Sequence, residues 1–412
     1  MNKFREHIFK QPILNIGLLG SVSDGKSTLA KKLSEKTTST HSSEKLRNIT
    51  IYQGYANFII LKDEYGEYHS TNAEDFDNSN ELVHHISFVD CPGHQELIQT
   101  MLTSIKLMDG AIIIIAVDQP LTNKPQLIQH LAAAKLNKLE KIIICMNKID
   151  LVDKETLMKR KIELDLLLKE YDIKPYIIIP TCFNKNIGLN YILQSIMELF
   201  NPDDYIERTE SDAFFRISRT FDINKPGTDW KDVSGGVIGG TLYNGILKVG
   251  DKILISPGQL VKEKDGKFYA KPFETTVLSL KTETTFLDTI NIGGLVAIGT
   301  DLDPYYCKNN NLAGNIVTLV DSKIKLKFCH EIELKVSLVN TFNAQWKPQL
   351  KDTVSLQIGT KSNEVKLIKM NNDIYTFVTT NNKPLCLREN EHIIICKNIE
   401  KILKIVAESV YL

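Results

Sequence analysis

The feature that most constrains this fold is a glycine-rich segment directly after an apolar run. Residues 20–27 read GSVSDGKS and match the pattern GxxxxGK[ST], and residues 14–19 before them are LNIGLL. In such a loop, backbone N–H groups curl around phosphates, a lysine reaches the β- and γ-phosphates, and a hydroxyl coordinates Mg²⁺. A glycine-rich turn without function is the alternative, which the strand before and the helix after disfavour. The residues expected to contact a nucleotide here are Gly20, Ser23, Asp24, Gly25, Lys26, Ser27 and Thr28, with Ser27 also a metal ligand.

Further apolar runs alternate with amphipathic stretches through residue ~200, which is typical of a doubly wound sheet. A run such as AIIIIAV, apolar at every position, indicates a strand buried on both faces of a parallel sheet. The expected strands are 14–19, 85–89, 111–117, 141–146 and 176–179, and two expected crossover helices are 127–139 and 191–200. Ligands of such folds bind beyond the carboxyl ends of the strands.

Two further strand ends carry polar motifs. Asp90 and Gly93 follow the strand at 85–89, where an acid can hold a metal through water and a glycine N–H can meet the γ-phosphate. The segment NKID follows the strand at 141–146; the Asp150 carboxylate can accept both N–H groups of a guanine edge while Asn147 meets its carbonyl oxygen. Either motif alone could be an ordinary turn, but their order after buried strands predicts a guanine-nucleotide site.

The base pocket should be completed by Lys148 and by the loop after the next strand. That loop contains Thr181, Cys182 and Phe183, which would contact the base mainly through their backbone. The expected cofactors are therefore GTP or GDP with Mg²⁺.

After residue ~210 the pattern changes to short strands separated by Gly, Pro, Asn and Asp, without intervening helices. Such spacing favours small antiparallel barrels. A second series of the same kind begins after Asp321. The sequence thus predicts an α/β GTPase domain at 1–207 with a doubly wound, mostly parallel sheet, followed by β-barrels at 208–320 and 321–412.

Several segments resemble the gamma subunits of translation initiation factor two. They are RNITIYQGYAN at 47–57, SFVDCPGH at 87–94, FDINKPG at 221–227, SGGVIGGTLYNGILKVGDKI at 234–253 and IGTDLDP at 298–304. The last three lie outside the GTPase domain, where general similarity among GTPases cannot explain them. The resemblance implies that Thr50 binds Mg²⁺ while γ-phosphate is present, that His94 orients the attacking water, and that Tyr55 faces the tRNA acceptor end.

The same resemblance implies a GTP-dependent carrier of initiator methionyl-tRNA, which releases the tRNA after hydrolysis. Its implied partners are the alpha and beta subunits of the factor, the small ribosomal subunit, a GTPase-activating protein and a nucleotide exchange factor. Two alternatives stay open: an elongation factor of the Tu class, against which FDINKPG speaks, and a GTP-binding scaffold that has lost hydrolysis.

The chain departs from this family in several places, two of which concern zinc and the phosphate loop. Residues 62–84 carry no cysteine where family members commonly have a zinc knuckle, so we expect no zinc and a flexible acidic loop instead. The phosphate loop has Ser21 and Asp24 where the family usually has histidines, and an aspartate beside phosphates is electrostatically unfavourable.

Composition adds limits rather than a function. Lys plus Arg and Asp plus Glu both number 50, so the net charge of zero argues against a dedicated nucleic-acid coat. The seven cysteines are scattered without CxxC spacing, as expected of reduced thiols in a cytoplasmic protein. No apolar run approaches the ~18 residues that span a bilayer, so no membrane contact is expected.

Overall fold

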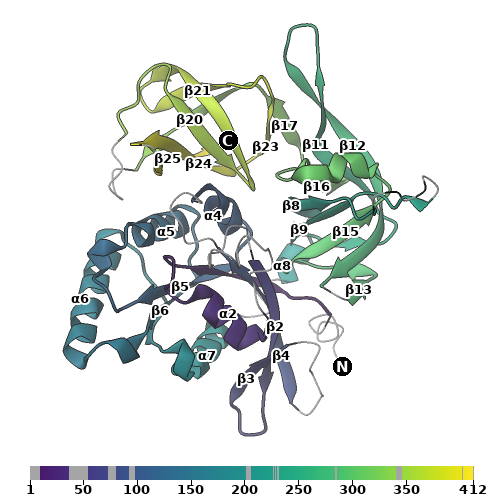
Figure 1. Cartoon of the computed structure of the whole chain (residues 1–412). Coiled ribbons are helices and arrows are strands. Elements are labelled where there is room, and N and C mark those ends of the chain that lie inside the picture. The colour runs from purple at the N-terminus through teal and green to yellow at the C-terminus, as the bar shows by residue number, and fades with distance from the viewer. Residues whose placement is uncertain are drawn as a thin grey trace. The chain divides into compact units, whose positions relative to one another are not determined.

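The computed structural model describes residues 10–36, 54–72, 80–91, 98–200, 206–225, 227, 229, 232–283, 285–339, 346–400 and 402–411. The chain forms two compact units, one built mainly from residues 1–202 and the other from 203–339 and 345–398 with the C-terminal strand end. The first unit combines helices with a sheet, and the second consists almost entirely of strands (Figure 1).

The first unit is a seven-stranded sheet in the order β3-β2-β4-β1-β5-β6-β7. Its strands from β4 to β7 pair in parallel, and β2 and β3 extend the sheet antiparallel at one edge. Every residue of β1 and β5 is buried, including the polar Asn15 of β1, and for β5 this agrees with the prediction from its uniformly apolar sequence. The strands are β1 (Leu14–Leu19), β2 (Gly54–Lys62), β3 (Tyr68–Thr71), β4 (Glu81–Asp90), β5 (Gly110–Ala116), β6 (Ile142–Asn147) and β7 (Ile177–Pro180).

Helices cover both faces of this sheet (Figure 1). They are α2 (Lys26–Ser34), α4 (Ile98–Ile105), α5 (Pro125–Leu136), α6 (Lys154–Glu170) and α7 (Leu189–Leu199), with single 3-10 turns at Leu121–Asn123, Ile149–Leu151 and Phe183–Lys185. The five predicted strands and the two predicted helices are all present, which confirms the α/β class of this unit.

The expectation of a flexible acidic loop at 62–84 is wrong for the part of it that is described. Residues 62–71 form the turn and return strand of a hairpin between β2 and β3. The turn is ordered because Oδ1 of Asp63 accepts hydrogen bonds from the backbone N–H groups of Tyr65 and Glu67, at 2.9 and 2.8 Å, and Gly66 adopts a φ of 86°. The polar composition of this segment therefore gave no indication that it extends the sheet with an antiparallel hairpin.

The second unit begins with a closed antiparallel barrel, here called the first barrel. Strands β11, β16, β8, β9, β15 and β12 pair in that order, and β11 pairs back with β12 to close the ring. Alternate residues such as Phe215 and Ile217 on β8 point into its core. The strands are β8 (Phe214–Phe221), β9 (Val237–Asn244), β10 (Leu247–Lys248), β11 (Lys252–Lys262), β12 (Phe268–Thr282), β13 (Thr285–Leu287), β14 (Thr289–Ile290), β15 (Val296–Thr300) and β16 (Ile316–Leu319), with α8 (Ile206–Thr209) and 3-10 turns in Pro304–Asn310.

The remaining strands form a second antiparallel sheet of barrel type, here called the second barrel. Its order is β18-β22-β21-β20-β24-β25-β19, and a separate pair joins β17 to β23. The strands are β17 (Leu326–Cys329), β18 (Glu331–Lys335), β19 (Ser337–Leu338), β20 (Thr353–Ile358), β21 (Lys361–Asn371), β22 (Ile374–Thr379), β23 (Leu385–Arg388), β24 (Glu391–Ile399) and β25 (Ile402–Tyr411). Both predicted barrels are thus confirmed as architecture, while the exact boundaries at 207 and 320 stay predictions.

A buried ion pair joins the two barrels within the second unit. Nη2 of Arg216 on β8 donates to both carboxylate oxygens of Glu391 on β24, at 2.8 and 2.7 Å. Arg216 is 4% exposed and Glu391 is 3% exposed, so the buried Arg216 charge depends on Glu391, whose carboxylate also lies 3.5 Å from Nε of Arg388. A Cβ on Gly359 would lie 1.7 Å from Nη1 of Arg216, which leaves glycine as the residue that fits there.

None of the helices in the described parts of the chain is both long enough and apolar enough to cross a membrane.

Candidate functional site

The glycine-rich loop lies between β1 and α2 and curves through left-handed backbone conformations. Gly20, Ser23 and Gly25 have φ angles of 146°, 64° and 113°. A Cβ on Gly25 would lie 2.4 Å from Nδ2 of Asn147, so a side chain does not fit there. The loop leads into the N-terminus of α2, where Lys26, Ser27 and Thr28 form the first turn. Unpaired N–H groups and the helix dipole favour an anion at this position.

Lys26 is held inside the loop that it is expected to serve. Its Nζ donates to the carbonyl oxygens of Gly20 and Ser21, both at 2.8 Å. Burial lowers the pKa of Lys26, while the charges of Asp90 and Asp24 act in the opposite direction. A buried ammonium is costly unless paired, and the phosphates of a nucleotide would supply the compensating charge.

Ser27 and Asp90 form the expected metal-binding corner. The Ser27 hydroxyl donates to Oδ2 of Asp90 at 2.8 Å, and Asp90 lies fully buried at the end of β4. A hydroxyl and a carboxylate beside the phosphate loop are hard oxygen ligands, the kind that Mg²⁺ prefers. These residues therefore fit a magnesium ion.

Asp24 is neutralised by a lysine that the sequence analysis did not single out. Lys124, just before α5, places its Nζ 2.5 Å from Oδ1 of Asp24. The same carboxylate accepts the backbone N–H groups of Ser21 at 2.9 Å and Ala116 at 3.2 Å. Asp24 is 2% exposed and Lys124 is 6% exposed, so the pair is shielded from water. The unfavourable charge expected of Asp24 is thus compensated within the protein.

His130 on α5 also anchors the phosphate loop. Its Nδ1 accepts the backbone N–H of Gly20 at 3.0 Å, which requires a neutral ring. Burial, together with the charge of Lys26, lowers the pKa of His130 to about 3. Neither His130 nor Lys124 belongs to a local motif; the one signal in the sequence is that both follow β5, whose carboxyl end lies beside that of β1.

Asn147, at the end of β6, connects the phosphate loop to the base loop. Its Nδ2 donates to the Asp24 carbonyl at 2.8 Å, and its Oδ1 accepts the N–H of Phe183 at 3.2 Å. The Thr181 hydroxyl also donates to that Oδ1, at 3.4 Å. The amide that was expected to meet guanine is therefore engaged in holding the two loops together.

Asp150 and its neighbours form the rim of the base pocket. Oδ2 of Asp150 lies 3.3 Å from Nζ of Lys185. A hydrogen bond from Cys182 and the charged hydrogen bond from Lys185 lower the pKa of Asp150, so its carboxylate is ionised and able to accept hydrogen bonds. Lys148 has a φ of 62° and pairs with Asp118 at 3.2 Å. The structure thus brings the NKID segment and residues 181–183 to one edge of the sheet.

The predicted site has four further residues. Thr50, Gly93 and His94 lie outside the described residues. Tyr55 lies on β2, opposite Val89 of β4, where it is half-buried.

The first unit matches the family model "Elongation factor Tu GTP binding domain" over residues 11–202. The whole chain is similar in fold to elongation factor SelB of Methanococcus maripaludis bound to the GTP analogue GppNHp, with a TM-score of 0.71 at 19% identity, covering 98% of this chain and 80% of that one. It is equally similar to a bacterial selenocysteine-specific elongation factor, with a TM-score of 0.71, of which it covers 58%. Fold, phosphate loop and family model together define a translational GTPase.

Curated relatives narrow the class further. The chain is 35% identical to eukaryotic translation initiation factor 2 subunit gamma of Encephalitozoon cuniculi, over 97% of this chain and 92% of the relative. It is 33% identical to translation initiation factor 2 subunit gamma of Methanopyrus kandleri, over 95% and 96% of the two chains. The corresponding protein of Methanocaldococcus jannaschii is 40% identical over 75% of each. This chain belongs to the family of translation initiation factor 2 gamma subunits and is a GTP-binding translation initiation factor.

Proposed function

We propose that this chain carries initiator methionyl-tRNA to the small ribosomal subunit while GTP is bound, and releases it after GTP hydrolysis. Membership of the gamma-subunit family is the observation that carries the proposal. The alpha and beta subunits, an activating protein and an exchange factor complete the cycle, which takes place in the cytoplasm. Loss of the γ-phosphate then changes tRNA affinity through a shift between two conformations.

The residues of the phosphate and base loops take the following roles in this proposal. Lys26 and the backbone N–H groups of the loop bind the phosphates, and Asp150 reads the guanine edge. Ser27 and Thr50 hold Mg²⁺, which when bound neutralises charge on the β- and γ-phosphates. His94 orients the attacking water. In this arrangement Asp24 and Asn147 act by positioning the loop and not by touching the reacting atoms.

A small pocket on the first barrel supports binding of a tRNA end. It has a volume of about 160 Å³ and is lined by Arg219 and Phe221 of β8 and by Lys281, Glu283 and Val296, among others. An aromatic ring with two cationic groups suits a terminal base and its phosphate. The carboxylate of Glu283 could accept a hydrogen bond from the amino group of an esterified amino acid. We therefore infer that the acceptor end binds at this pocket, while contact of Tyr55 with the acceptor end stays a prediction from the family resemblance.

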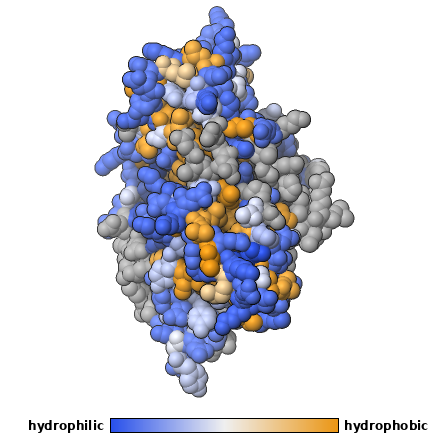
Figure 2. Space-filling model, turned by 90° about the vertical axis from the view of Figure 1, so that its left-hand side faces the viewer, coloured by the Kyte–Doolittle hydropathy of each residue, from blue (hydrophilic) through white to orange (hydrophobic). Residues whose placement is uncertain are grey.

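An exposed apolar row on α6 supports docking of a partner subunit on the GTPase unit. Met158, Ile162 and Leu166 recur every four residues and are 55%, 57% and 64% exposed, and Leu151 before the helix is 62% exposed. Figure 2 faces the side on which α6 lies in Figure 1 and shows hydrophobic side chains gathered there between hydrophilic ones. Apolar side chains aligned on a helix and rimmed by charges mark interaction sites.

The test is filter binding of initiator methionyl-tRNA in the GTP and GDP states, with elongator methionyl-tRNA and uncharged initiator tRNA as controls. Binding that requires GTP and the methionyl group and prefers the initiator would support the proposal. Equal binding of both methionyl-tRNAs would favour a carrier of the Tu class instead. If no tRNA binds, either to the chain alone or to the chain with alpha and beta subunits, the scaffold alternative is favoured. GTP turnover with small ribosomal subunits would then show whether hydrolysis persists.

A further inference from the structure

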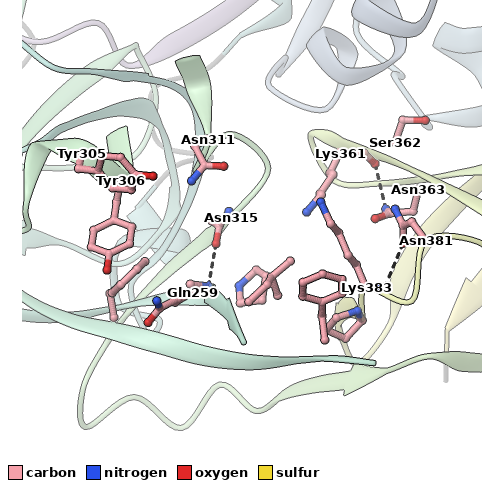
Figure 3. A pocket seen from close by; sticks show the side chains of 16 residues that line it. Gln259, Tyr305, Tyr306, Asn311, Asn315, Lys361, Ser362, Asn363, Asn381 and Lys383 are labelled. Carbon is pink, nitrogen blue, oxygen red and sulfur yellow. Dashed lines mark hydrogen bonds between the residues drawn. The ribbon is translucent and has the colours of Figure 1, made fainter. Parts of the chain in front are cut away.

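A pocket of about 410 Å³ lies within the second unit, between the first and the second barrel. Its walls come from β11, β12 and residues 305–315 on one side and from residues 361–384 on the other. Figure 3 shows Lys361 and Lys383 on one side of the pocket and Asn315 and Tyr306 on the other. A volume of this size suits a ligand as large as a nucleotide.

The walls are fixed by contacts between and within the barrels. The backbone N–H of Phe268 donates to the Asn382 carbonyl at 2.9 Å, and Nε2 of His330 contacts the Phe268 carbonyl at 2.8 Å. The amide oxygen of Asn315 accepts the N–H of Gly258 at 2.9 Å, which holds the inner wall. The pocket is therefore formed before any ligand arrives.

The charge of the pocket is positive. Lys361 and Lys383 line it, and no aspartate or glutamate does. The stem of Lys361 packs on Gly314, where an added Cβ would lie 2.6 Å from the Lys361 Cβ. Burial lowers the pKa of the Lys361 amine, and the charge of Lys383 lowers it further. Within the described part of the chain neither lysine forms an ion pair with a carboxylate. Two cations brought together in this way favour an anionic ligand.

The wall opposite the lysines is aromatic. The rings of Phe273 and Tyr306 lie 4.5 Å apart between centroids, and Tyr305 follows at 5.7 Å from Tyr306. Tyr305 is 69% exposed, which places an open aromatic face at the rim. The side-chain amides of Gln259 and Asn311 also line the pocket and can bond a base edge or a ribose.

We propose that this pocket binds a nucleotide of a single-stranded RNA, with its phosphate at Lys361 and Lys383 and its base against the aromatic wall. Aromatic rings combined with lysines are the means by which proteins bind single-stranded nucleic acid. The exposed ring of Tyr305 provides a surface for a second, adjacent base, and this favours a strand over a free nucleotide. The proposal goes beyond the GTPase cycle and does not depend on recognition of the tRNA acceptor end.

The test uses the full chain saturated with GDP and Mg²⁺, so that the GTPase site is filled. Binding of a short oligouridine, phosphorylated at one end and fluorescent at the other, is followed by anisotropy over a series of KCl concentrations. The pocket variant is Lys361→Gln/Lys383→Gln. The control is Lys366→Gln/Lys369→Gln, which removes the same charge from exposed positions of β21. Thermal unfolding of both variants establishes that they fold.

The wild-type chain and the control should bind the oligonucleotide alike, and the pocket variant at least ~10-fold more weakly. Because both lysines contact one phosphate, their loss should reduce the slope of log K against log salt by ~0.7. Tyr305→Ala should weaken binding of the oligonucleotide by ~5-fold, in line with one lost stacking contact. Binding of uridine monophosphate by this variant should stay unchanged. Failure of the wild-type chain to bind, or equal binding by the pocket and control variants, would overturn the proposal. Competition by uridine monophosphate as strong as by the strand would overturn the assignment to RNA.

Discussion

Replacement of Lys124 by methionine should weaken nucleotide binding and destabilise the GTPase unit, and replacement of Asp24 as well should restore both. Lys124 is the cation that pairs with Asp24 inside the phosphate loop, at 2.5 Å. With both side chains almost fully buried, removal of one partner leaves a charge without compensation. Such losses cost about 3–5 kcal/mol, whereas removal of both charges is often close to neutral.

The effect on the nucleotide follows from the same charge. At an effective dielectric constant of ~20 and a separation of ~6 Å, two like unit charges repel by about 3 kcal/mol. The GDP dissociation constant of Lys124→Met should therefore rise by ~100-fold. In the double variant Lys124→Met/Asp24→Asn, the amide oxygen at position 24 can still accept the N–H of Ser21, so GDP affinity should return to within ~10-fold of wild type.

Titration with a fluorescent GDP analogue measures the affinity, and urea unfolding of the same proteins measures the stability. Lys154→Met removes a charge from an exposed position of α6 and serves as the control. If Lys124→Met binds GDP as tightly as the control, the pair does not support the loop. If the double variant is no better than the single one, the reasoning from an uncompensated buried charge fails.

Three further outcomes are expected. The pKa of His130 is about 3 in the fold, against 6.5 for an ordinary histidine, so the unfolded chain binds this proton first as the pH falls below 6.5. The wild-type chain should therefore lose about 1.4 kcal/mol more stability per pH unit than His130→Asn, whose side chain can still accept the Gly20 N–H. Unfolding measured as a function of pH tests this. Asp150→Asn should weaken GTP binding by at least ~100-fold, because two hydrogen bonds to a charged acceptor are lost, and should strengthen binding of xanthosine triphosphate. If a competition assay shows the same preference for GTP over xanthosine triphosphate as in the wild-type chain, Asp150 does not recognise the base. Glu391→Gln should destabilise the second unit by about 3 kcal/mol in urea unfolding, since Arg216 would be left buried and unpaired; a loss no larger than that of Glu331→Gln, an exposed change, would contradict this.

Much of the fold could be predicted because its signals are local. A run such as residues 111–117 is apolar at every position, and that pattern alone indicates a strand inside a parallel sheet. The phosphate loop and the NKID segment each sit after such a strand, so their meeting at one edge follows from topology. Turn residues at regular spacing in the C-terminal half likewise indicated two barrels.

The features that could not be predicted from the sequence depend on contacts between residues that are far apart in the chain. Lys124 and Asp24 are separated by 100 positions, and neither side chain carries a pattern that indicates the other. Arg216 and Glu391 meet only because two barrels pack together. The hairpin after β2 was missed because its turn is polar, and composition does not distinguish an ordered turn built on Asp63 from a loop without fixed structure.

The central claim is that guanine-nucleotide state and initiator tRNA affinity are coupled in this chain. Coupling between two ligands is reciprocal, so it can be measured from the nucleotide side. The measurement is the affinity of the full chain for GTP and for GDP, each with and without saturating methionylated initiator tRNA. We predict that the tRNA raises the affinity for GTP relative to GDP by ~10-fold or more, within the usual range of such coupling. An unchanged ratio of the two affinities would contradict the account.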